Sequence, residues 1–267
     1  MRSRLDVSLV SRGLAESREK AQALVMAGRV RVAGAVVRKP SDPVPPQAAL
    51  MVEPGPEHVG RGALKLAGAL DAFGIDPAGR VAVDVGASTG GFTEVLLARG
   101  ARKVYAVDVG RGQLHERLRA DRRVVVRDKV NARNLGATEV PEPCTMAVVD
   151  VSFISVARVL PALRSVLAEG ADAVVLVKPQ FEVGRGQVGR GGIVTDPALH
   201  ARSLLAVATA AQQEAAFGMR GACPSPVTGA EGNREFLLHL VAGAPPMPEA
   251  EMASRTAAAA QPLTVGA

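Results

Sequence analysis

The stretch that decides the fold is Val81-Ala82-Val83-Asp84-Val85-Gly86-Ala87-Ser88-Thr89-Gly90-Gly91-Phe92. It begins as an apolar run typical of a buried strand, passes through a glycine-rich turn and leads into an apolar helical stretch at residues 94–97. Four more apolar runs follow, at residues 104–107, 124–126, 146–149 and 173–177. Because strands that alternate with helices form parallel βαβ units, the sequence predicts an α/β fold with a Rossmann-like doubly wound sheet. A further helix is expected near 197–214, and two further strands near 219–227 and 235–241.

Polar residues follow the ends of the four later strands. They are Asp108, Asp128, Asp150 and Lys178. Doubly wound sheets bind their ligands at the carboxyl ends of the strands. We therefore expect these side chains around one ligand site.

The glycine-rich turn admits three interpretations. A dinucleotide fingerprint needs glycine where Ser88 stands. Residues 86–90 also fit the Gly-x-Ser-x-Gly elbow of hydrolases, with Asp150 and either His200 or His239 completing a triad. That elbow normally lies deep inside a hydrolase sheet, whereas this turn follows the first strand. We also expect His200 to be a surface residue of an amphipathic helix, which argues against the hydrolase.

The third interpretation is a pocket for S-adenosylmethionine. Small residues let the backbone approach the methionine part, and Asp84 can hold its ammonium group directly or through water. Asp108 can accept hydrogen bonds from both ribose hydroxyls, while Asp128 or Asn131 can meet the adenine edge. The cofactor-binding residues expected on this basis are Asp84, Gly86, Ala87, Ser88, Thr89, Gly90, Gly91, Phe92, Asp108, Asp128 and Asn131.

The positive charge is concentrated at the N-terminus. The chain has a net charge of +6, and residues 1–39 hold nine basic residues against three acidic ones, which accounts for the whole excess. The same segment reads as two short helices followed by a hairpin at residues 29–37. A basic head on a neutral body indicates a polyanionic partner, either nucleic acid or an anionic membrane surface. The side chains that could line one phosphate-binding face are Arg18, Lys20, Arg29, Arg31, Arg38 and Lys39.

Composition divides the chain into three parts. Residues 41–57 contain five prolines, which indicates an irregular edge or linker and a boundary near residues 55–60. We expect a head at residues 1–58, a body at 59–243 and a disordered Ala/Pro-rich tail at 244–267. There is no uncharged apolar stretch of about 18 residues and no signal-peptide pattern, so we expect a cytoplasmic protein that does not enter membranes. Nothing indicates an obligate protein partner.

The head resembles the S4 RNA-binding module. The similarity lies in Arg4-Leu5-Asp6, Gly13-Leu14-Ala15-x-Ser17-Arg18, Ala21, Gly28-x-Val30-x-Val32-x-Gly34 and Lys39-Pro40. The resemblance implies an RNA partner for the basic face. The RNA-binding residues that it implies are Arg4, Arg18, Lys20, Arg29, Arg31 and Lys39.

The chain as a whole resembles the TlyA family, whose members are described as haemolysins and as ribosomal RNA 2′-O-ribose methyltransferases with an FtsJ-type domain. The motifs that carry this likeness are Arg61-Gly62-x-x-Lys65-Leu66, the stretch from Asp84 to Thr93, Asp150-x-Ser152-Phe153-Ile154-Ser155, Val177-Lys178-Pro179-Gln180-Phe181-Glu182 and Gly232-Asn233-Arg234-Glu235-Phe236. The resemblance implies methylation of ribosomal RNA in ribosomal subunits, with S-adenosylmethionine as the cofactor and cytidine as the methylated nucleotide.

FtsJ-type enzymes use a Lys-Asp-Lys-Glu tetrad, and the matching residues are Lys65, Asp150, Lys178 and Glu235. A ribose hydroxyl must lose its proton as it attacks the methyl group, so Lys178 is expected to act as base or to contact the developing alkoxide. The other three residues orient it and the ribose. Because the sulfonium is already activated, no metal is required.

Two alternatives and one departure accompany this interpretation. A membrane-damaging haemolysin would need a long amphipathic helix or barrel strands, and an RNA-binding protein without activity would need a broken tetrad. The junction between the parts carries His58 and Gly60 where many relatives have an aromatic residue and a serine. Any coupling of cofactor binding to RNA binding through this linker is therefore in doubt. The sequence does not identify the ribosomal subunit that is methylated.

Overall fold

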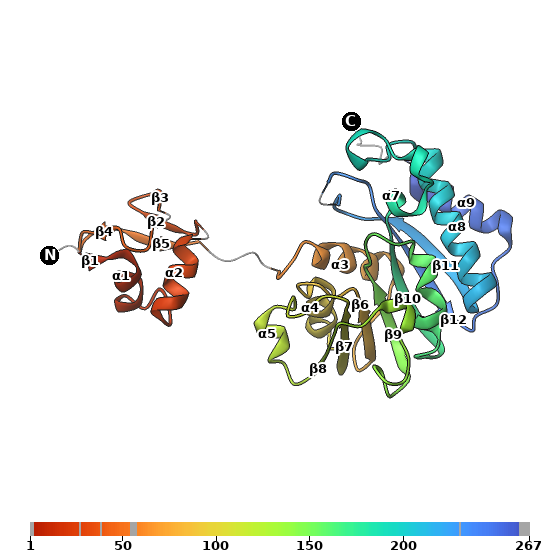
Figure 1. Cartoon of the computed structure of the whole chain (residues 1–267), viewed down its shortest axis with the longest axis horizontal. Helices are drawn as coiled ribbons and strands as arrows, with labels where there is room; N and C mark the ends of the chain where they lie inside the picture. The colour runs from red at the N-terminus through yellow and green to blue at the C-terminus, as the bar shows by residue number, and fades with distance from the viewer. Residues whose placement is uncertain (1–2, 27, 38, 54–57, 230, 262–267) are drawn as a thin grey trace. The chain divides into compact units, whose positions relative to one another are not determined.

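The computed structural model describes residues 3–26, 28–37, 39–53, 58–229 and 231–261. The chain divides into two compact units, residues 1–58 and 59–267, which are the head and the body (Figure 1). Arg38, part of the expected phosphate-binding face, lies outside the described residues.

The head has a small apolar core between two helices and short strands. Its elements are β1 (Ser3–Arg4), α1 (Leu5–Ser11), α2 (Arg18–Met26), β2 (Val30–Val32), β3 (Ala35–Val37), β4 (Pro43–Val44) and β5 (Leu50–Val52). The expected helices and hairpin are confirmed, and Ser17 caps α2 by accepting a hydrogen bond from the backbone N–H of Lys20. Ala33 and Gly34, both at positive φ, form the tight turn of the hairpin. β5 pairs with the other edge of β2, while β1 pairs with β4.

The body contains one seven-stranded sheet. Its elements are α3 (Gly62–Phe73), β6 (Val81–Val85), α4 (Gly91–Ala98), β7 (Lys103–Asp108), α5 (Glu116–Arg119), β8 (Val124–Asp128), β9 (Cys144–Val149), α6 (Leu160–Arg164), β10 (Leu167–Val177), α7 (Pro179–Glu182), α8 (Pro197–Ala215), β11 (Phe217–Pro224), β12 (Phe236–Ala242) and α9 (Glu249–Ala260).

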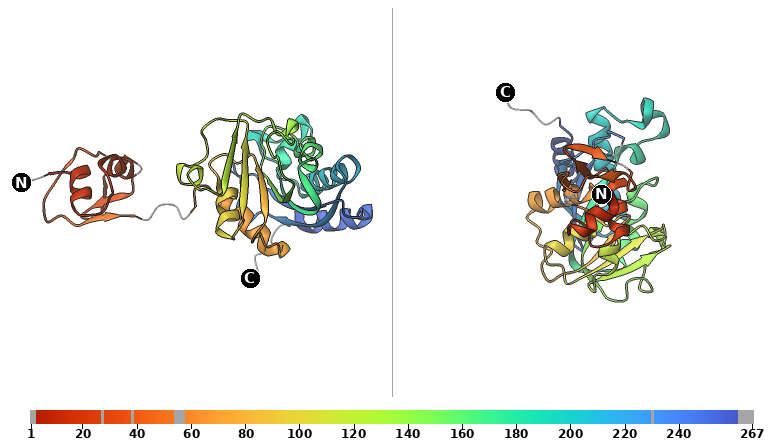
Figure 2. Two further views of the ribbon diagram at one scale, coloured as in Figure 1. Left: turned by 90° about the horizontal axis from the view of Figure 1, so that it is seen from below. Right: turned by 90° about the vertical axis from the view of Figure 1, so that its left-hand side faces the viewer.

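The strand order of this sheet is β11-β12-β10-β9-β6-β7-β8. The five strands from β10 to β8 are mutually parallel, and β12 runs antiparallel to both of its neighbours. Alternate residues of the strands enter two separate apolar clusters, one beneath α3, α4 and α5 and the other beneath α6, α8 and α9. Helices therefore cover both faces of the sheet (Figure 2), and the doubly wound α/β fold is confirmed.

The expectation of a disordered tail is wrong for residues 249–260. These residues form α9, which packs against α8 and β11 and buries Met252, Thr256 and Ala260. The guanidinium of Arg234 donates to the carbonyl oxygens of Ala260 and Gln261 at the end of the helix. The buried face of α9 consists mostly of small residues, so it lacks the large apolar side chains by which an amphipathic helix is recognised in a sequence.

Candidate active site

A cavity of about 440 Å³ opens at the carboxyl ends of β6, β7 and β9. This is the edge of the sheet at which the sequence predicts a ligand site. The cavity brings together five of the expected site residues, Gly86, Ser88, Asp108, Asn131 and Asp150. The other lining residues are Val107, Val109, Gln113, Val130, Ala132, Arg133, Val151, Ser152, Phe153, Ile154 and Val159.

The glycine-rich turn contributes Gly86 and Ser88 to the lining of the cavity, and only glycine fits at two positions of the turn. Gly86 and Gly90 have φ values of 85° and 100°, which side chains rarely adopt. A Cβ atom at Gly86 would overlap the carbonyl oxygen of Asp150, and one at Gly90 would overlap the side chain of Leu118. The turn therefore lies directly against the strand that carries Asp150.

Asp108 and Asp128, both expected to bind the cofactor, differ in their position relative to the cavity. Asp108 lines the cavity and accepts hydrogen bonds from the backbone N–H groups of Ser88 (2.8 Å) and Gly110 (2.7 Å), which fix its carboxylate. Asp128 does not line the cavity, because its Oδ2 is held by the Gly112 N–H at 3.1 Å and by Arg119 at 3.2 Å. Of the two candidates for the adenine edge, the structure thus brings only Asn131 to the cavity.

Asp84 is fully buried behind the turn. Its Oδ2 accepts a hydrogen bond from the Thr93 hydroxyl at 2.6 Å, while Oδ1 has no partner. Burial raises the pKa of this carboxyl to about 7. A buried acceptor without a partner suits a cationic group bound nearby, although Asp84 itself does not line the cavity.

The four tetrad residues lie at the same edge through strand register and one helix. β10 and β12 are antiparallel with Val177 opposite Phe236, so Lys178 and Glu235 are the next residues beyond that pair. Asp150 directly follows β9, which lies beside β10. Together these positions gather three charged side chains that are far apart in the sequence.

The tetrad forms two ion pairs. Lys178 Nζ lies 2.6 Å from Asp150 Oδ1 and donates to the Ser152 hydroxyl at 2.7 Å. Lys65, in α3, donates from Nζ to Glu235 Oε2 at 2.5 Å. Both lysines are buried, with Lys65 7% and Lys178 9% exposed. A buried cation is tolerated when it is paired in this way.

Two features of the site have no assigned role in the sequence. Glu182 accepts hydrogen bonds from the Ser155 hydroxyl (2.6 Å) and the Val156 N–H (2.8 Å), which ties the loop after β9 to α7; burial raises the pKa of its carboxyl. Phe153 is 91% exposed at a φ of 65°, beside the ring of Phe181 and at the wall of the cavity. Both lie in recognised motifs, but the direction of a side chain is not readable from a motif.

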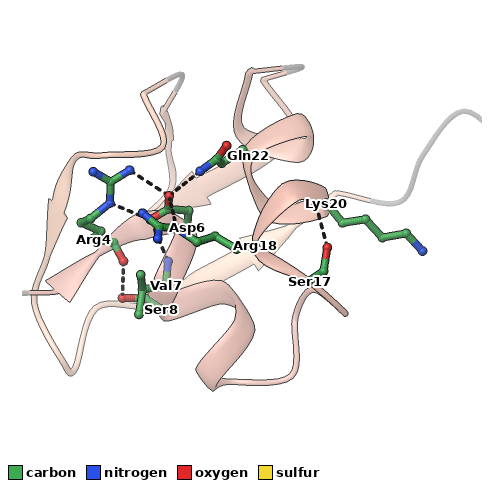
Figure 3. A network of polar contacts seen from close by, with 8 residues as sticks. All are labelled: Arg4, Asp6, Val7, Ser8, Ser17, Arg18, Lys20 and Gln22. Carbon is green, nitrogen blue, oxygen red and sulfur yellow. Dashed lines mark hydrogen bonds and ion pairs between the residues drawn. The ribbon is translucent and has the colours of Figure 1, made fainter.

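Most of the expected RNA-binding residues of the head make contacts within it. Arg4 and Arg18 contact Asp6 (Figure 3). The other contacts pair Lys20 with Glu16, Arg31 with Glu53, and the Arg29 guanidinium with the Glu53 carbonyl oxygen. Lys39 is exposed. Most of the basic side chains of the head are therefore held in place by contacts within the head.

Comparison with known proteins identifies both units. The model of the S4 domain family matches residues 3–50, and that of the FtsJ-like methyltransferase family matches residues 58–242. The chain is 53% identical over 241 residues, 90% of each chain, to the Mycobacterium tuberculosis protein named 16S/23S rRNA (cytidine-2′-O)-methyltransferase TlyA. The chain belongs to the TlyA family. It is therefore an FtsJ-like methyltransferase, a class that uses S-adenosylmethionine.

Other TlyA-like proteins carry a different name. The protein named Hemolysin A of Brachyspira hyodysenteriae is 39% identical over 242 residues, covering 89% of this chain and 99% of the relative. A solved structure described as a putative hemolysin from Streptococcus thermophilus superposes with a TM-score of 0.71 at 39% identity, covering 97% and 95% of the two chains. No helix among the described residues of this TlyA-family chain is long and apolar enough to cross a membrane.

The hydrolase interpretation is wrong, because both of its candidate histidines have partners other than Asp150. The expectation that His200 is a surface residue is wrong, because it is fully buried with Nε2 2.8 Å from the Val194 carbonyl oxygen, and burial lowers the pKa of its ring. His239 pairs with Asp172 at 2.7 Å. Asp150 instead pairs with Lys178.

Proposed function

We propose that this chain transfers a methyl group from S-adenosylmethionine to the 2′-hydroxyl of a cytidine ribose in ribosomal RNA. The observation that carries the proposal is that two residues lining the cavity also contact Lys178. Asp150 and Ser152 line the cofactor-sized cavity, and both contact Lys178 Nζ. A lysine is thereby anchored at the wall of the cavity, where a methyl donor and an acceptor hydroxyl would meet.

The residues of the cavity fit the cofactor. Glycine at position 86 lets the turn lie against the backbone of Asp150, since a Cβ there would overlap the Asp150 carbonyl oxygen, and Gly86 and Ser88 line the cavity where the methionine part would lie. The fixed carboxylate of Asp108 retains lone pairs for the ribose hydroxyls. Asn131 supplies an amide for the adenine edge. The bound cofactor would supply an electrophilic methyl group.

Lys178 is the residue we assign to the acceptor oxygen. An ammonium group has three N–H donors; Lys178 donates one to the Ser152 hydroxyl, and its charge is paired with the Asp150 carboxylate. A donor that Ser152 does not engage remains for the ribose 2′-oxygen. There it would stabilise the negative charge that develops as the O–C bond to the methyl group forms, the S–C bond breaks and the hydroxyl proton passes to solvent. Anchoring by two partners fixes the direction of that donor before substrate binds.

The second ion pair supports the first. Lys65 and Glu235 are both buried. Glu235 directly precedes β12, the strand that pairs with β10, and Lys178 directly follows β10. Gly229 lies so close to Glu235 that a Cβ there would approach Oε1 to 2.5 Å, so glycine at position 229 leaves the space that the Glu235 carboxylate occupies. We assign Lys65 and Glu235 to orienting the ribose and Lys178.

The head supplies RNA affinity in this proposal. It carries the net positive charge of the chain and matches the S4 family. Phosphate contacts are independent of sequence and position a protein on its nucleic acid. Arginines of the body are paired with acids as those of the head are, Arg117 with Glu94, Arg119 with Asp128 and Arg123 with Asp121. The net charge, whose whole excess lies in residues 1–39, is therefore what favours the head as the main docking surface.

The experiment is methyl transfer from tritiated S-adenosylmethionine to purified small and large ribosomal subunits, followed by nuclease mapping and alkaline hydrolysis. A 2′-O-methyl group blocks alkaline cleavage at its own nucleotide, so the product is placed on the ribose. Lys103→Ala is the matched control, because Lys103 is also ion-paired but begins β7 at the opposite edge of the sheet. Label on a base, or on neither subunit, would overturn the proposal.

A further inference from the structure

Asp6 is a buried acid in the middle of the basic head. Its side chain is fully buried, and its two oxygens accept five hydrogen bonds (Figure 3). Oδ1 accepts from Arg4 Nε at 3.0 Å and from the Val7 N–H at 2.9 Å. Oδ2 accepts from Arg4 Nη2 (2.9 Å), Arg18 Nε (3.1 Å) and Gln22 Nε2 (2.9 Å). Above all, the bonds from Arg4 hold the pKa of this carboxyl well below its usual range.

The shared oxygen brings two guanidinium groups together. Arg4 Nη2 and Arg18 Nε contact the same Oδ2 atom, so these two nitrogens lie no more than about 6 Å apart. Like charges at this distance repel, and the carboxylate between them offsets the repulsion. The side chains of Arg4 and Arg18 are 46% and 54% exposed, so they extend from the buried acid to the solvent.

Most donors of these two arginines remain available to a ligand. A guanidinium has five N–H donors, of which Arg4 directs two and Arg18 one to Asp6. Planar donors held at fixed positions match the oxygens of a phosphate group. Because the buried end of each arginine is fixed, less conformational entropy is lost when the exposed end binds.

We propose that Asp6 is a positioning residue for RNA binding, which holds Arg4 and Arg18 as one cationic fork for a backbone phosphate. The inference rests on the proposed function, in which the head binds RNA. The proposal predicts an effect opposite to the one expected from charge alone. If charge alone mattered, removing the negative charge of Asp6 from a polyanion-binding face would strengthen RNA binding. If Asp6 holds the fork, removing that charge weakens RNA binding.

The test compares two variants of the full-length protein that change the charge equally. Asp6→Asn removes the anchor, and Asp42→Asn removes a second acid of the head that lies outside the Asp6 network. Fluorescence anisotropy with a labelled RNA hairpin measures Kd over a range of salt concentrations. We expect Asp42→Asn to bind as tightly as the wild type or more tightly, and Asp6→Asn to bind about tenfold more weakly. The salt slope of Asp6→Asn should fall by about one for each phosphate that this variant no longer binds.

Further variants separate this inference from the proposed function. If the double variant Arg4→Ala, Arg18→Ala binds RNA like the wild type, the RNA-binding role of this face is wrong. If that double variant is weakened but Asp6→Asn binds as tightly as Asp42→Asn, the positioning role is wrong. Asp6→Asn added to the double alanine variant should cause no further loss, whereas a merely structural role would lower affinity again.

A charge-preserving variant covers the case in which Asp6→Asn unfolds the head, which circular dichroism and amide NMR would show. Arg4→Lys, Arg18→Lys keeps both charges but loses the planar fork. We expect weaker RNA binding from this variant. Wild-type affinity would overturn the proposal.

Discussion

The buried carboxyl of Asp84 makes the stability of the body depend on pH in a direction opposite to that of a salt-bridged acid. Burial raises its pKa from 3.8 to about 7. Above pH 4 the unfolded chain releases this proton, while the folded chain keeps it until about pH 7. The free energy of unfolding contributed by this residue therefore falls as the pH rises between these values. At 1.36 kcal/mol per pKa unit, the loss amounts to about 4 kcal/mol.

Asp84→Asn removes this dependence and leaves the volume unchanged. The buried amide leaves one polar group without a partner, which costs about 1–3 kcal/mol at every pH. Urea unfolding from pH 4.5 to 8 can be followed by the fluorescence of Tyr105. It is the only tyrosine, the chain has no tryptophan, and Tyr105 lies buried in β7, so the signal reports the body alone.

We expect the variant to gain stability relative to the wild type as the pH rises, by about 3 kcal/mol between pH 4.5 and 8. The exposed Asp76, changed to Asn, serves as the control for a charge change in the same unit and should show no such trend. A difference between Asp84→Asn and the wild type that stays constant from pH 4.5 to 8 would refute the argument from burial.

Three further predictions follow from the site and the head. Asp108→Asn should weaken S-adenosylmethionine binding by about 1–3 kcal/mol, because the ribose hydroxyls lose a charged acceptor; unchanged calorimetric affinity would remove Asp108 from the site. Residues 59–267 alone should fold and bind the cofactor, but bind ribosomal RNA more weakly and with a shallower salt dependence; methylation of subunits at the full-length rate would make the head dispensable. Phe153→Ala should weaken RNA binding by about 1–3 kcal/mol if the exposed ring stacks on a base, and equal Kd values for the variant and the wild type would count against that contact.

The fold of the body could be predicted because its signals are local. The strand at 81–85 is an unbroken apolar run, and the turn after it carries glycines where the chain must turn sharply. The register that places Lys178 beside Glu235 depends on pairing between β10 and β12, which no single segment encodes. The resemblance to a known family supplied that association.

The sequence was less informative wherever the role of a residue depends on its partners. His200 lies on a helix of mixed polarity and is buried because residues 192–194 and Phe236 enclose it. Asp128 is the last residue of a strand, as Asp108 is, yet it contacts Arg119 and does not line the cavity. Asp6 reads as one acid among many basic residues, and only its five hydrogen bonds show its importance in the head.

The claim that Lys178 acts on the acceptor hydroxyl has the most direct test of all. Single-turnover methyl transfer to ribosomal RNA should be measured for the wild type and for Lys178→Ala, with Lys103→Ala as the control, at saturating cofactor. We expect the rate of Lys178→Ala to fall by about 10²–10⁴, while its affinities for S-adenosylmethionine and RNA stay within about twofold of the wild type, a difference of less than 1 kcal/mol. A rate for Lys178→Ala close to that of Lys103→Ala would contradict the account, because Lys178 would then not be the residue that stabilises the acceptor oxygen.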